Sequence, residues 1–577
     1  MAGPRKHRWL AAVTVFALSI TTLGAAPTHA ATLCDTPPAY LQDDQILPGM
    51  TGTGYTVIQG TTVESFDVEI LGTQPDGIAP GVDFILIQVS GPLIDETGGI
   101  AAGFSGSPVY IGGKLAGSVS YGFFGSDPTI GGMTPASQLI KVLNYPNSVL
   151  TGASSVTLSD SLRRTVAKTT GTKVSASPTT ATPIAVPGVI SGNAPRAMKR
   201  MQHWMTREGT PIQMSQGGAE PAPTGFSPVT PQPGDSIGAV FSFGDVTFGG
   251  IGTLTIVCND QVVAFGHPLD LDGPTNIALT TAPIIKTITD PSQVFGAWKF
   301  GNVGDLIGTI DNDRITGIGG VAGVMPHLTP ITTDMTDTVN GTTREGVTEV
   351  AFQPFLGFIA YYHMYLNLLT LTDRYAPGGG PFDPQILGTD PDGNPFHVRV
   401  KDIYWSDYDV NDVAFYASYR LLWPLLYRFS NQIQINSVRI VGSTTDQDLT
   451  GRIKKLEWST PLQPKLGTYS NLIVPRGGTV HFRVWIQAPD GTLHSYDTDL
   501  KVNKHMRNSG FLYVSGGGYG YYRTSNDFHE VVHQLNNQPG FSDVAFNLYT
   551  RGQNGQASAA TDYVVQGRRR VDVRIVG

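Results

Sequence analysis

A glycine-flanked serine, Ser105, is the residue of this sequence whose setting points most directly to chemistry. It lies in the stretch GFSGSPVYIGGKLAGSVSY, residues 103–121. Gly112 and Gly113 separate two apolar runs, and such a pair predicts a hairpin turn because both positions need a positive φ. The serine is therefore expected on a tight turn that leads into a β-hairpin. There, the amides of Gly103 and Ser105 can point at a developing oxyanion. A purely structural turn serine is the alternative.

A serine nucleophile needs a base, and His267 is the candidate. It follows the apolar run VVAF and lies between Gly266 and Pro268, where the turn leaves the imidazole little freedom. A side chain held in this way suits a general base that must stay oriented. A structural histidine that stabilises the turn is the alternative.

A second motif with chemical meaning is His529-Glu530-Val531-Val532-His533, which fits the pattern H-E-x-x-H. On a helix, this pattern places two histidines one turn apart beside a glutamate, as in zinc peptidases. No histidine or glutamate follows the motif to serve as a third ligand. The surrounding residues predict a short amphipathic helix that packs on a sheet. We therefore expect no metal and no other cofactor, and zinc catalysis is the least favoured hypothesis.

Composition narrows the class of protein. The chain has 577 residues, of which 69 are glycine and 40 are proline, and only 15% are charged. This balance favours short strands and many turns over long helices. The formal net charge is −8, and no basic stripe interleaved with aromatic residues is present, so we expect no nucleic-acid partner.

The N-terminus has the layout of a secretory signal peptide over residues 1–30. Basic residues precede an apolar run from Trp9 to Ala26, and Thr28-His29-Ala30 offers small residues for cleavage. We expect a secreted or cell-envelope protein with no stable membrane span after cleavage; a retained anchor is the alternative. The later apolar run Phe355–Leu369 is short and contains polar side chains, so it predicts a buried helix.

Two cysteines, Cys34 and Cys258, remain in the exported chain. In an oxidising compartment they can form one disulfide, which would tie the mature N-terminus to a strand far along the chain. Two free buried thiols are the alternative, and the sequence does not choose between them.

Several of these stretches together resemble the SpoIVB-type serine peptidases, the sporulation stage IV B peptidase family. GFSGSPVY and GGKLAGSVSYGF look like the nucleophile region, and TGTGYTVIQGTTVESFDVEILG and TGGIAAG upstream fit the same pattern. GIGTLTIVCNDQVVAFGHPL and VGDLIGTIDNDRITGIGG look like the histidine region. The likeness covers residues 49–140 and 236–325 and extends more weakly to the C-terminal β region.

The resemblance implies a mainly β, trypsin/chymotrypsin-like double β-barrel. Ser105 would be the nucleophile, His267 the general base, and the amides of Gly103 and Ser105 the oxyanion hole. Sporulation members place the histidine block first, whereas here the serine block comes first. Such a permuted order is acceptable because a triad depends on geometry and not on chain order.

The acid of the triad is less well defined. At the position where the family has its acid, this chain has Ser90. Asp95 is the nearest replacement, and Asp245, at the start of the histidine block, is another. A serine–histidine dyad or an inactive site is the remaining alternative.

We therefore expect a secreted serine peptidase that hydrolyses a protein or peptide substrate through an acyl-enzyme on Ser105. A catalytically inactive protein of the same fold, binding a peptide or cell-wall ligand, is the hypothesis from a different class. The substrate and the oligomeric state are not indicated.

The expected domains are a signal peptide (1–30), the serine half-barrel (31–156), a Thr/Ala/Pro/Gly-rich linker (157–235), the histidine half-barrel (236–325), an α+β region (326–470) and a β-sandwich-like module (471–577). Pro424 should kink or end the second helix of the α+β region.

Overall fold

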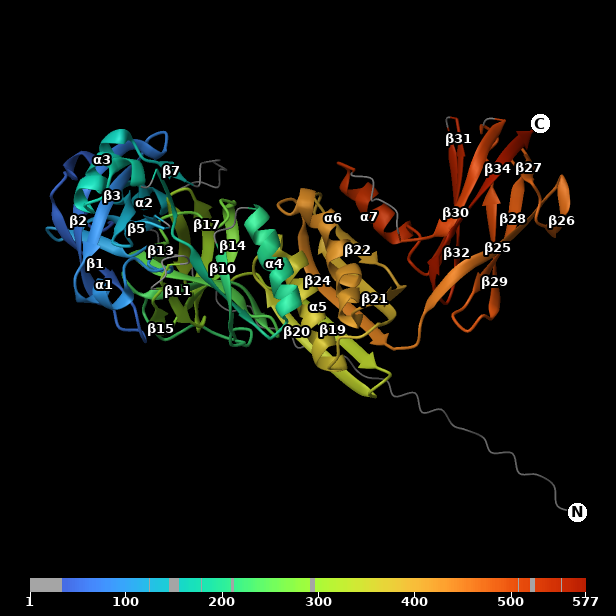
Figure 1. The fold of residues 1–577 in the computed structure, drawn as a ribbon, viewed down its shortest axis with the longest axis horizontal. Helices are drawn as coiled ribbons and strands as arrows, with labels where there is room; N and C mark the ends of the chain where they lie inside the picture. Colours follow the sequence, from blue (N-terminus) through green and yellow to red (C-terminus); the bar gives the residue numbers. More distant parts are fainter. Residues whose placement is uncertain are drawn as a thin grey trace, which may run out of the picture. The chain divides into compact units, whose positions relative to one another are not determined.

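The fold is mainly β, as predicted, with 49% of the residues in strands and 18% in helices (Figure 1). No helix among the described residues is long and apolar enough to cross a membrane. The expected signal peptide at 1–30 lies outside the described residues. The computed structural model describes residues 34–123, 125–144, 155–177, 179–208, 212–290, 296–506, 508–518, 525–551 and 553–577.

The first barrel is a closed ring of six antiparallel strands that carries the serine turn. The strands pair in the order β4-β1-β2-β3-β6-β5, and pairing between β4 and β5 closes the ring. Alternate residues of β2 (Phe66, Val68 and Ile70) are buried in its core, because successive side chains of a strand face opposite sides. Gly112 and Gly113, both at positive φ, make the predicted β4–β5 turn. The elements are β1 (Thr51–Thr56), β2 (Glu64–Ala79), β3 (Val82–Ser90), α1 (Pro92–Thr97), β4 (Pro108–Ile111), β5 (Lys114–Gly122), β6 (Ile130–Pro135) and α2 (Ala136–Val142).

Six later strands form a second ring, which carries His267. β11, β12, β13, β18, β17 and β14 pair in succession, and β14 pairs back with β11. Asn259, at positive φ, makes the tight β12–β13 turn. The prediction of a double barrel with the serine half first is confirmed. The elements are β11 (Ser236–Gly244), β12 (Phe248–Cys258), β13 (Gln261–Ala264), β14 (Gly273–Thr281), β15 (Ile284–Ile288), β16 (Trp298–Gly301), β17 (Leu306–Arg314) and β18 (Gly317–Ala322).

Residues 157–235, expected as a linker, contain ordered helices and strands. β8 pairs with β5 of the first barrel, and β9 pairs with β12 of the second. Because Thr, Pro and Ala are frequent in these residues, their composition predicted a linker. Apolar side chains such as Val186, Val189 and Ile190 are nevertheless buried. The chain thus crosses from one barrel to the other between β8 and β9. The elements are α3 (Asp160–Thr169), β8 (Thr180–Pro183), β9 (Val186–Ser191), α4 (Pro195–Glu208) and β10 (Ile212–Gly217).

The middle region extends the sheet of the second barrel and packs helices on it. β20 pairs with β11, and β19, β24, β21 and β22 follow in order. α5 is buried on nearly all sides, as predicted for the apolar run at 355–369. Pro424 lies inside α6, so the helix does not end there; a π-helical turn directly precedes α6 and accommodates the irregular winding. The elements are β19 (Thr329–Asp337), β20 (Thr342–Val350), α5 (Leu356–Thr372), β21 (Gly378–Thr389), β22 (Pro395–Arg399), β23 (Asp402–Ser406), α6 (Arg420–Phe429) and β24 (Gln434–Thr444).

The C-terminal module is a sandwich of two five-stranded sheets with its own core. Trp458, Phe482 and Phe546 are buried in that core. The sandwich begins with β25, before the expected boundary at 471. α7 (Phe528–Asn537) differs from expectation because its apolar face joins the core of the middle region. The strands are β25 (Thr450–Thr460), β26 (Gln463–Gly467), β27 (Asn471–Pro475), β28 (Thr479–Gln487), β29 (Leu493–Lys501), β30 (Ser509–Gly516), β31 (Asp543–Thr550), β32 (Asn554–Ala560), β33 (Val564–Gln566) and β34 (Arg568–Val576).

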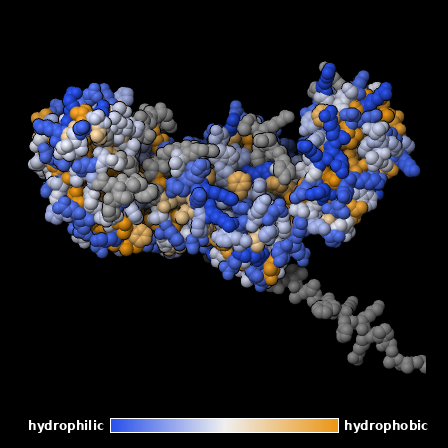
Figure 2. Space-filling view, viewed as in Figure 1, coloured by the Kyte–Doolittle hydropathy of each residue, from blue (hydrophilic) through white to orange (hydrophobic). Residues whose placement is uncertain are grey.

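Figure 2 shows hydrophilic residues over most of the drawn face, with hydrophobic residues scattered among them in small groups. Scattered apolar side chains of this kind are normal for a folded protein and need no partner.

A disulfide joins Cys34 to Cys258 at the end of β12. The sequence separation of the two cysteines is 224 residues, and the first barrel and strands β11 and β12 of the second lie within this loop. The segment before the first barrel is thereby held covalently to the second barrel.

Reduction of this disulfide is expected to lower the free energy of unfolding by about 2–4 kcal/mol, because the long closed loop restricts the unfolded chain. Urea unfolding of residues 31–577 with and without reductant measures the loss. Cys258→Ser should give a similar loss, and reductant should then have no further effect. Equal stability of the parent protein in both conditions would contradict the expectation.

Candidate functional site

The serine turn is fixed between the two barrels by backbone contacts. Gly103 and Gly106 have φ values of 93° and 96°, so the chain bends sharply on both sides of Ser105. Thr253 of β12 donates its amide N–H to the carbonyl of Ser105 and its hydroxyl to the carbonyl of Gly103, both at 2.8 Å. A Cβ on Gly106 would lie 1.9 Å from the carbonyl oxygen of Thr253, so only glycine fits. The second barrel therefore holds the turn that the first barrel supplies.

His267 reaches Ser105 from the second barrel, so the two residues singled out in the sequence meet. Nε2 of His267 lies 2.8 Å from Oγ of Ser105, and Nδ1 lies 2.8 Å from the carbonyl oxygen of Pro268. A carbonyl only accepts hydrogen bonds, so Nδ1 carries the proton and Nε2 turns its lone pair to the hydroxyl. This is the tautomer that a general base requires. Both side chains are fully buried.

Burial lowers the pKa of His267 from its ordinary value to about 4, because a buried imidazolium loses its hydration. Hydrogen bonds to the carbonyls of Pro268 and Ile184 act in the opposite direction and offset only part of this effect. The imidazole is therefore neutral, and able to accept a proton, across the whole neutral range.

We expect His267 to titrate near pH 4 in the folded protein. Because burial holds the folded pKa below the ordinary histidine value, the ring should stay neutral as the pH falls through 6. NMR of the protein labelled with ¹⁵N-histidine measures this, and the signals missing in His267→Gln assign the ring. An apparent pKa of about 6 or above would contradict the expectation.

The third position of a triad is taken by a main-chain carbonyl. Nδ1 of His267 binds the carbonyl of Pro268, because the turn folds that carbonyl back onto the ring. Asp95 lies exposed on α1. Asp245 accepts hydrogen bonds from the amide of Val347 and from the side chain of Asn367. In the described part of the chain, neither aspartate bonds to His267, so the expectation of an acid at Asp95 is corrected to a serine–histidine pair oriented by a carbonyl.

Asp313, which sequence reasoning missed, holds the loop after the histidine. Its carboxylate oxygens accept the amides of Leu269, Asp270 and Leu271 at distances between 2.7 and 2.9 Å. Burial nevertheless raises the pKa of this carboxyl to about 6. In the sequence, Asp313 is recognisable only as an acidic residue at the end of the apolar stretch LIGTIDNDR. This position does not identify the amides that its carboxylate accepts.

Asp313→Ala is expected to lower the free energy of unfolding by about 3 kcal/mol, because three amides lose their acceptor and each buried unpaired group is costly. Urea unfolding at pH 7 measures the loss. Asp305→Ala, which changes an exposed aspartate one residue before β17, is the matched control and should shift the value by less than about 0.5 kcal/mol. Equal effects of the two substitutions would contradict a positioning role for Asp313.

Two amides beside the nucleophile are available to a substrate. Within the described ranges, neither the amide of Gly103 nor that of Ser105 donates to a protein acceptor. They are the two donors that the sequence predicts for an oxyanion hole. The left-handed φ of Gly103 sets the direction of the peptide between them.

A buried lysine supports the turn from behind, and sequence reasoning missed it too. Lys299 donates to the hydroxyls of Thr56, Ser236 and Thr253 at 2.9–3.0 Å. Its methylenes pack under Gly103, where a Cβ would lie 3.0 Å from Cδ. Burial lowers the pKa of this amine well below its usual range. Thr253 therefore links the amine to the serine turn.

A small cavity of about 70 Å³ opens beside the turn. Ile100, Phe123, Pro128, Ile184 and Ala297 are among its lining residues, so its walls are mainly apolar. Its apolar walls suit an aliphatic side chain, and Asp290, which also lines the cavity, accepts a hydrogen bond from the amide of Gly296.

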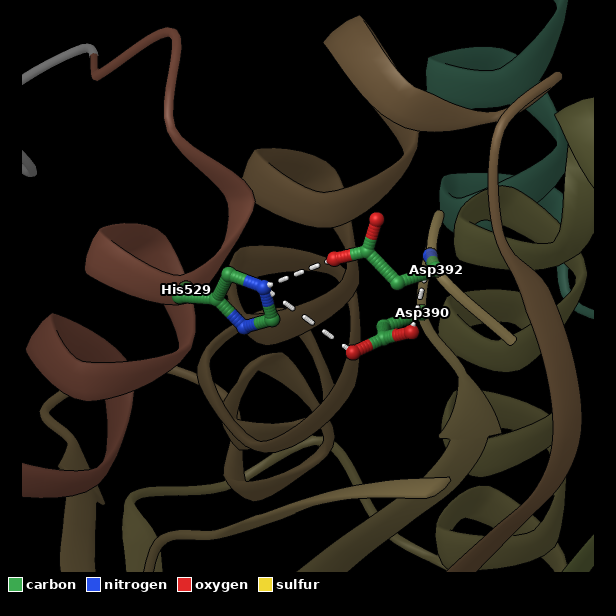
Figure 3. Close-up of side chains that lie close together, drawn as sticks. All are labelled: Asp390, Asp392 and His529. Carbon is green, nitrogen blue, oxygen red and sulfur yellow. Dashed lines mark hydrogen bonds and ion pairs between the residues drawn. The ribbon is translucent and has the colours of Figure 1, made fainter. Parts of the chain in front are cut away.

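The H-E-x-x-H motif lies on α7, but its two histidines do not converge. Nε2 of His529 lies 3.5 Å from a carboxylate oxygen of Asp392 and 3.9 Å from one of Asp390 (Figure 3). His533 instead contacts Asn537 on its own helix, with 3.2 Å between Nδ1 and Nδ2. Among the described residues, the ligand atoms that lie close together are those of Asp390, Asp392 and His529. The helix thus does not present both histidines to one ion, as a zinc peptidase would require.

Residues 37–139 match the family model of the SpoIVB peptidase S55. The matched segment contains the serine turn, and over this range it confirms the resemblance drawn from the sequence. The match supports a peptidase of the SpoIVB type. The half that carries His267 lies outside the matched segment. No curated protein matches the chain, and no solved structure does.

Proposed function

We propose that this chain is a secreted serine peptidase that cleaves peptide bonds through an acyl-enzyme on Ser105, with His267 as general base. The observation that carries the proposal is the 2.8 Å contact between Oγ of Ser105 and Nε2 of His267. It is supported by the match of the serine-bearing segment to a peptidase family. The endopeptidase specificity and the export of the protein are part of the proposal.

In the proposed reaction, the Ser105 oxygen attacks the scissile carbonyl carbon while its proton passes to Nε2 of His267. The amides of Gly103 and Ser105 stabilise the oxyanion. Nε2 then protonates the leaving amine, and a water molecule, deprotonated by the same nitrogen, releases the acyl group. The carbonyl of Pro268 keeps the ring in the required tautomer throughout.

In the described part of the chain no acid is hydrogen-bonded to His267, and this affects the chemistry of the reaction. A carbonyl orients the ring as an acid does, but it carries no full negative charge to stabilise the imidazolium that forms during attack. The low pKa of His267 makes it a weaker base than an ordinary histidine. We therefore expect turnover to be slow compared with triad peptidases.

A fluorophosphonate probe tests the activated serine, with labelling followed by intact mass. Ser105 is fully buried, and the carbonyl of Ile184 lies 3.4 Å from its hydroxyl. Labelling is therefore measured over a day, and also in Ile184→Gly, which removes an apolar side chain that lines the cavity beside the turn. We expect Ser105→Ala and His267→Ala each to reduce labelling at least about 100-fold, because the pair acts as a unit.

Ser137→Ala and His481→Ala, which change residues of the same types outside the site, are the matched controls and should label like the parent. Folding of each variant is checked by its thermal unfolding curve. Absence of labelling in both the parent protein and Ile184→Gly would contradict the proposal. It would favour the alternative, a non-catalytic protein that binds a peptide or cell-wall ligand.

A further inference from the structure

The turn between β21 and β22 carries two aspartates, Asp390 and Asp392, whose carboxylates point to the same side (Figure 3). Oδ1 of Asp390 accepts the amides of Asp392 and Asn394 at 2.9 and 2.7 Å. The amide of Gly393, which has a φ of 85°, donates to the carbonyl of Asp390 at 3.0 Å. These bonds fix the turn and leave Oδ2 of Asp390 outside its hydrogen bonding.

α7 brings His529 to this turn and is held against β22 by contacts of its own. The side chain of Asn536 accepts the amide of Arg399 at 2.9 Å and donates to a carbonyl of the same strand. Phe528 packs edge-on against Phe396, with the ring centroids 4.9 Å apart. Both ends of the helix are thereby fixed on the hairpin, so the position of His529 does not depend on the aspartates.

The ring nitrogen of His529 lies at distances from the two carboxylates that suit a shared ion better than a direct bond. Nε2 is 3.5 Å from Oδ2 of Asp392 and 3.9 Å from Oδ2 of Asp390. Both distances exceed the length of an ordinary N–H···O hydrogen bond, about 2.7–3.2 Å. By contrast, the exposed pair His481 and Asp499 closes to 2.5 Å.

The three ligand atoms are arranged as the first coordination sphere of a metal ion requires. Ligand atoms about 2.0–2.1 Å from a tetrahedral ion lie about 3.4 Å from one another. The two distances from His529 are close to this value, and all three ligand atoms lie within 4.8 Å of one another. A small rotation of the two exposed side chains brings them to one ion.

The carboxylate of Asp390 is a buried charge that points into this cluster. Its side chain is only 5% exposed, and no hydrogen-bond donor among the described residues binds its Oδ2. In the same part of the chain, no lysine or arginine pairs with Asp390 or Asp392. Buried charges in proteins are paired or coordinate metals, and two facing carboxylates repel each other. The imidazole supplies at most one positive charge, whereas a divalent cation matches both carboxylates.

The set of donor atoms selects the class of ion. Two carboxylates and one imidazole nitrogen suit zinc and the neighbouring transition metals, whereas calcium takes about six to eight oxygen ligands. We propose that Asp390, Asp392 and His529 bind one divalent ion of the zinc class. The side chains of His529 and Asp392 are 63% and 72% exposed, so water completes the coordination on the solvent side.

The proposal departs from the expectation of no metal drawn from the H-E-x-x-H motif. Asp392 precedes His529 by 137 residues, so the motif alone does not reveal this ligand. The second histidine of the motif lies apart, and Glu530 accepts a hydrogen bond from Gln534 on its own helix at 2.8 Å. No general base of the motif therefore faces the ion, and its role is structural.

The ion joins two parts of the fold. In the chain, α7 lies between β30 and β31 of the C-terminal sandwich, whereas the β21–β22 turn belongs to the middle region. A metal bond between them holds the C-terminal module on the middle region. The site uses neither Ser105 nor His267, so it stands independently of the proposed peptidase.

Isothermal titration calorimetry with ZnCl₂ at pH 7 tests the site on residues 31–577, purified without a histidine tag. We expect one zinc ion to bind, and His529→Asn, Asp390→Asn and Asp392→Asn each to weaken this binding at least about 10-fold. Asp390→Asn keeps an oxygen that can accept the two amides of the turn, so its effect reports the lost charge. The visible absorption of cobalt(II), added in place of zinc, is a second readout of the same ligands.

His533→Asn, one turn further along α7, and His481→Asn, at an exposed histidine elsewhere, are the matched controls and should bind zinc like the parent. Thermal unfolding curves show that each variant is folded. Calcium at the same concentration should not displace the zinc ion, because it disfavours an imidazole ligand.

Three outcomes would overturn the proposal. The first is no zinc binding at concentrations up to about 100 µM, or equal binding by the parent and the three ligand variants. The second is a loss of binding in His533→Asn, which would assign the ion to the other histidine. The third is displacement by calcium, which would exclude the zinc class. None of them bears on the peptidase, which is tested by the labelling of Ser105.

Discussion

The site depends on the close approach of one turn of the first barrel to one strand of the second. Gly106 lies against the carbonyl of Thr253 without room for a Cβ, and the amide and hydroxyl of Thr253 donate to the carbonyls of Ser105 and Gly103. Because these bonds are short and buried, a relative shift of the barrels breaks several of them together. The distance from the nucleophile to its base is therefore set by barrel packing and not by a flexible loop.

The same packing decides the chemistry of the base. Burial removes water from His267 and keeps it neutral, while the carbonyl of Pro268 selects its tautomer. The loop that bears this carbonyl is held in turn by Asp313 through three amides. The negative charge of a triad acid is thus replaced by a neutral acceptor on a rigid loop. Orientation is preserved, and electrostatic stabilisation of the charged imidazole is reduced.

Local patterns in the sequence predicted the parts of the fold that local chemistry determines. Paired glycines predicted the β4–β5 turn, and the glycine-flanked serine and the turn histidine lie together in the fold. The disulfide was one of two alternatives that the sequence left open. The double-barrel architecture came from the family resemblance and not from periodicity.

Features that depend on long-range packing were missed. Asp313 acts on amides more than forty residues away in sequence, with separations of 42 to 44, and no local pattern signals such a contact. Residues 157–235 looked like a linker because Thr and Pro dominate them, yet Ile184 and Val186 are buried through pairing with strands of two different barrels. Asp95 was chosen as the acidic residue nearest to Ser90, where the family has its acid, and in the fold it lies exposed on α1.

The order of the two halves has a consequence for the time at which the site is assembled. Proteins are made from the N-terminus, and domains tend to fold as they emerge. Ser105 precedes His267 by 162 residues, so the serine half is complete before its base has been synthesised. A nascent chain therefore carries a serine hydroxyl without its base until the second barrel has been made.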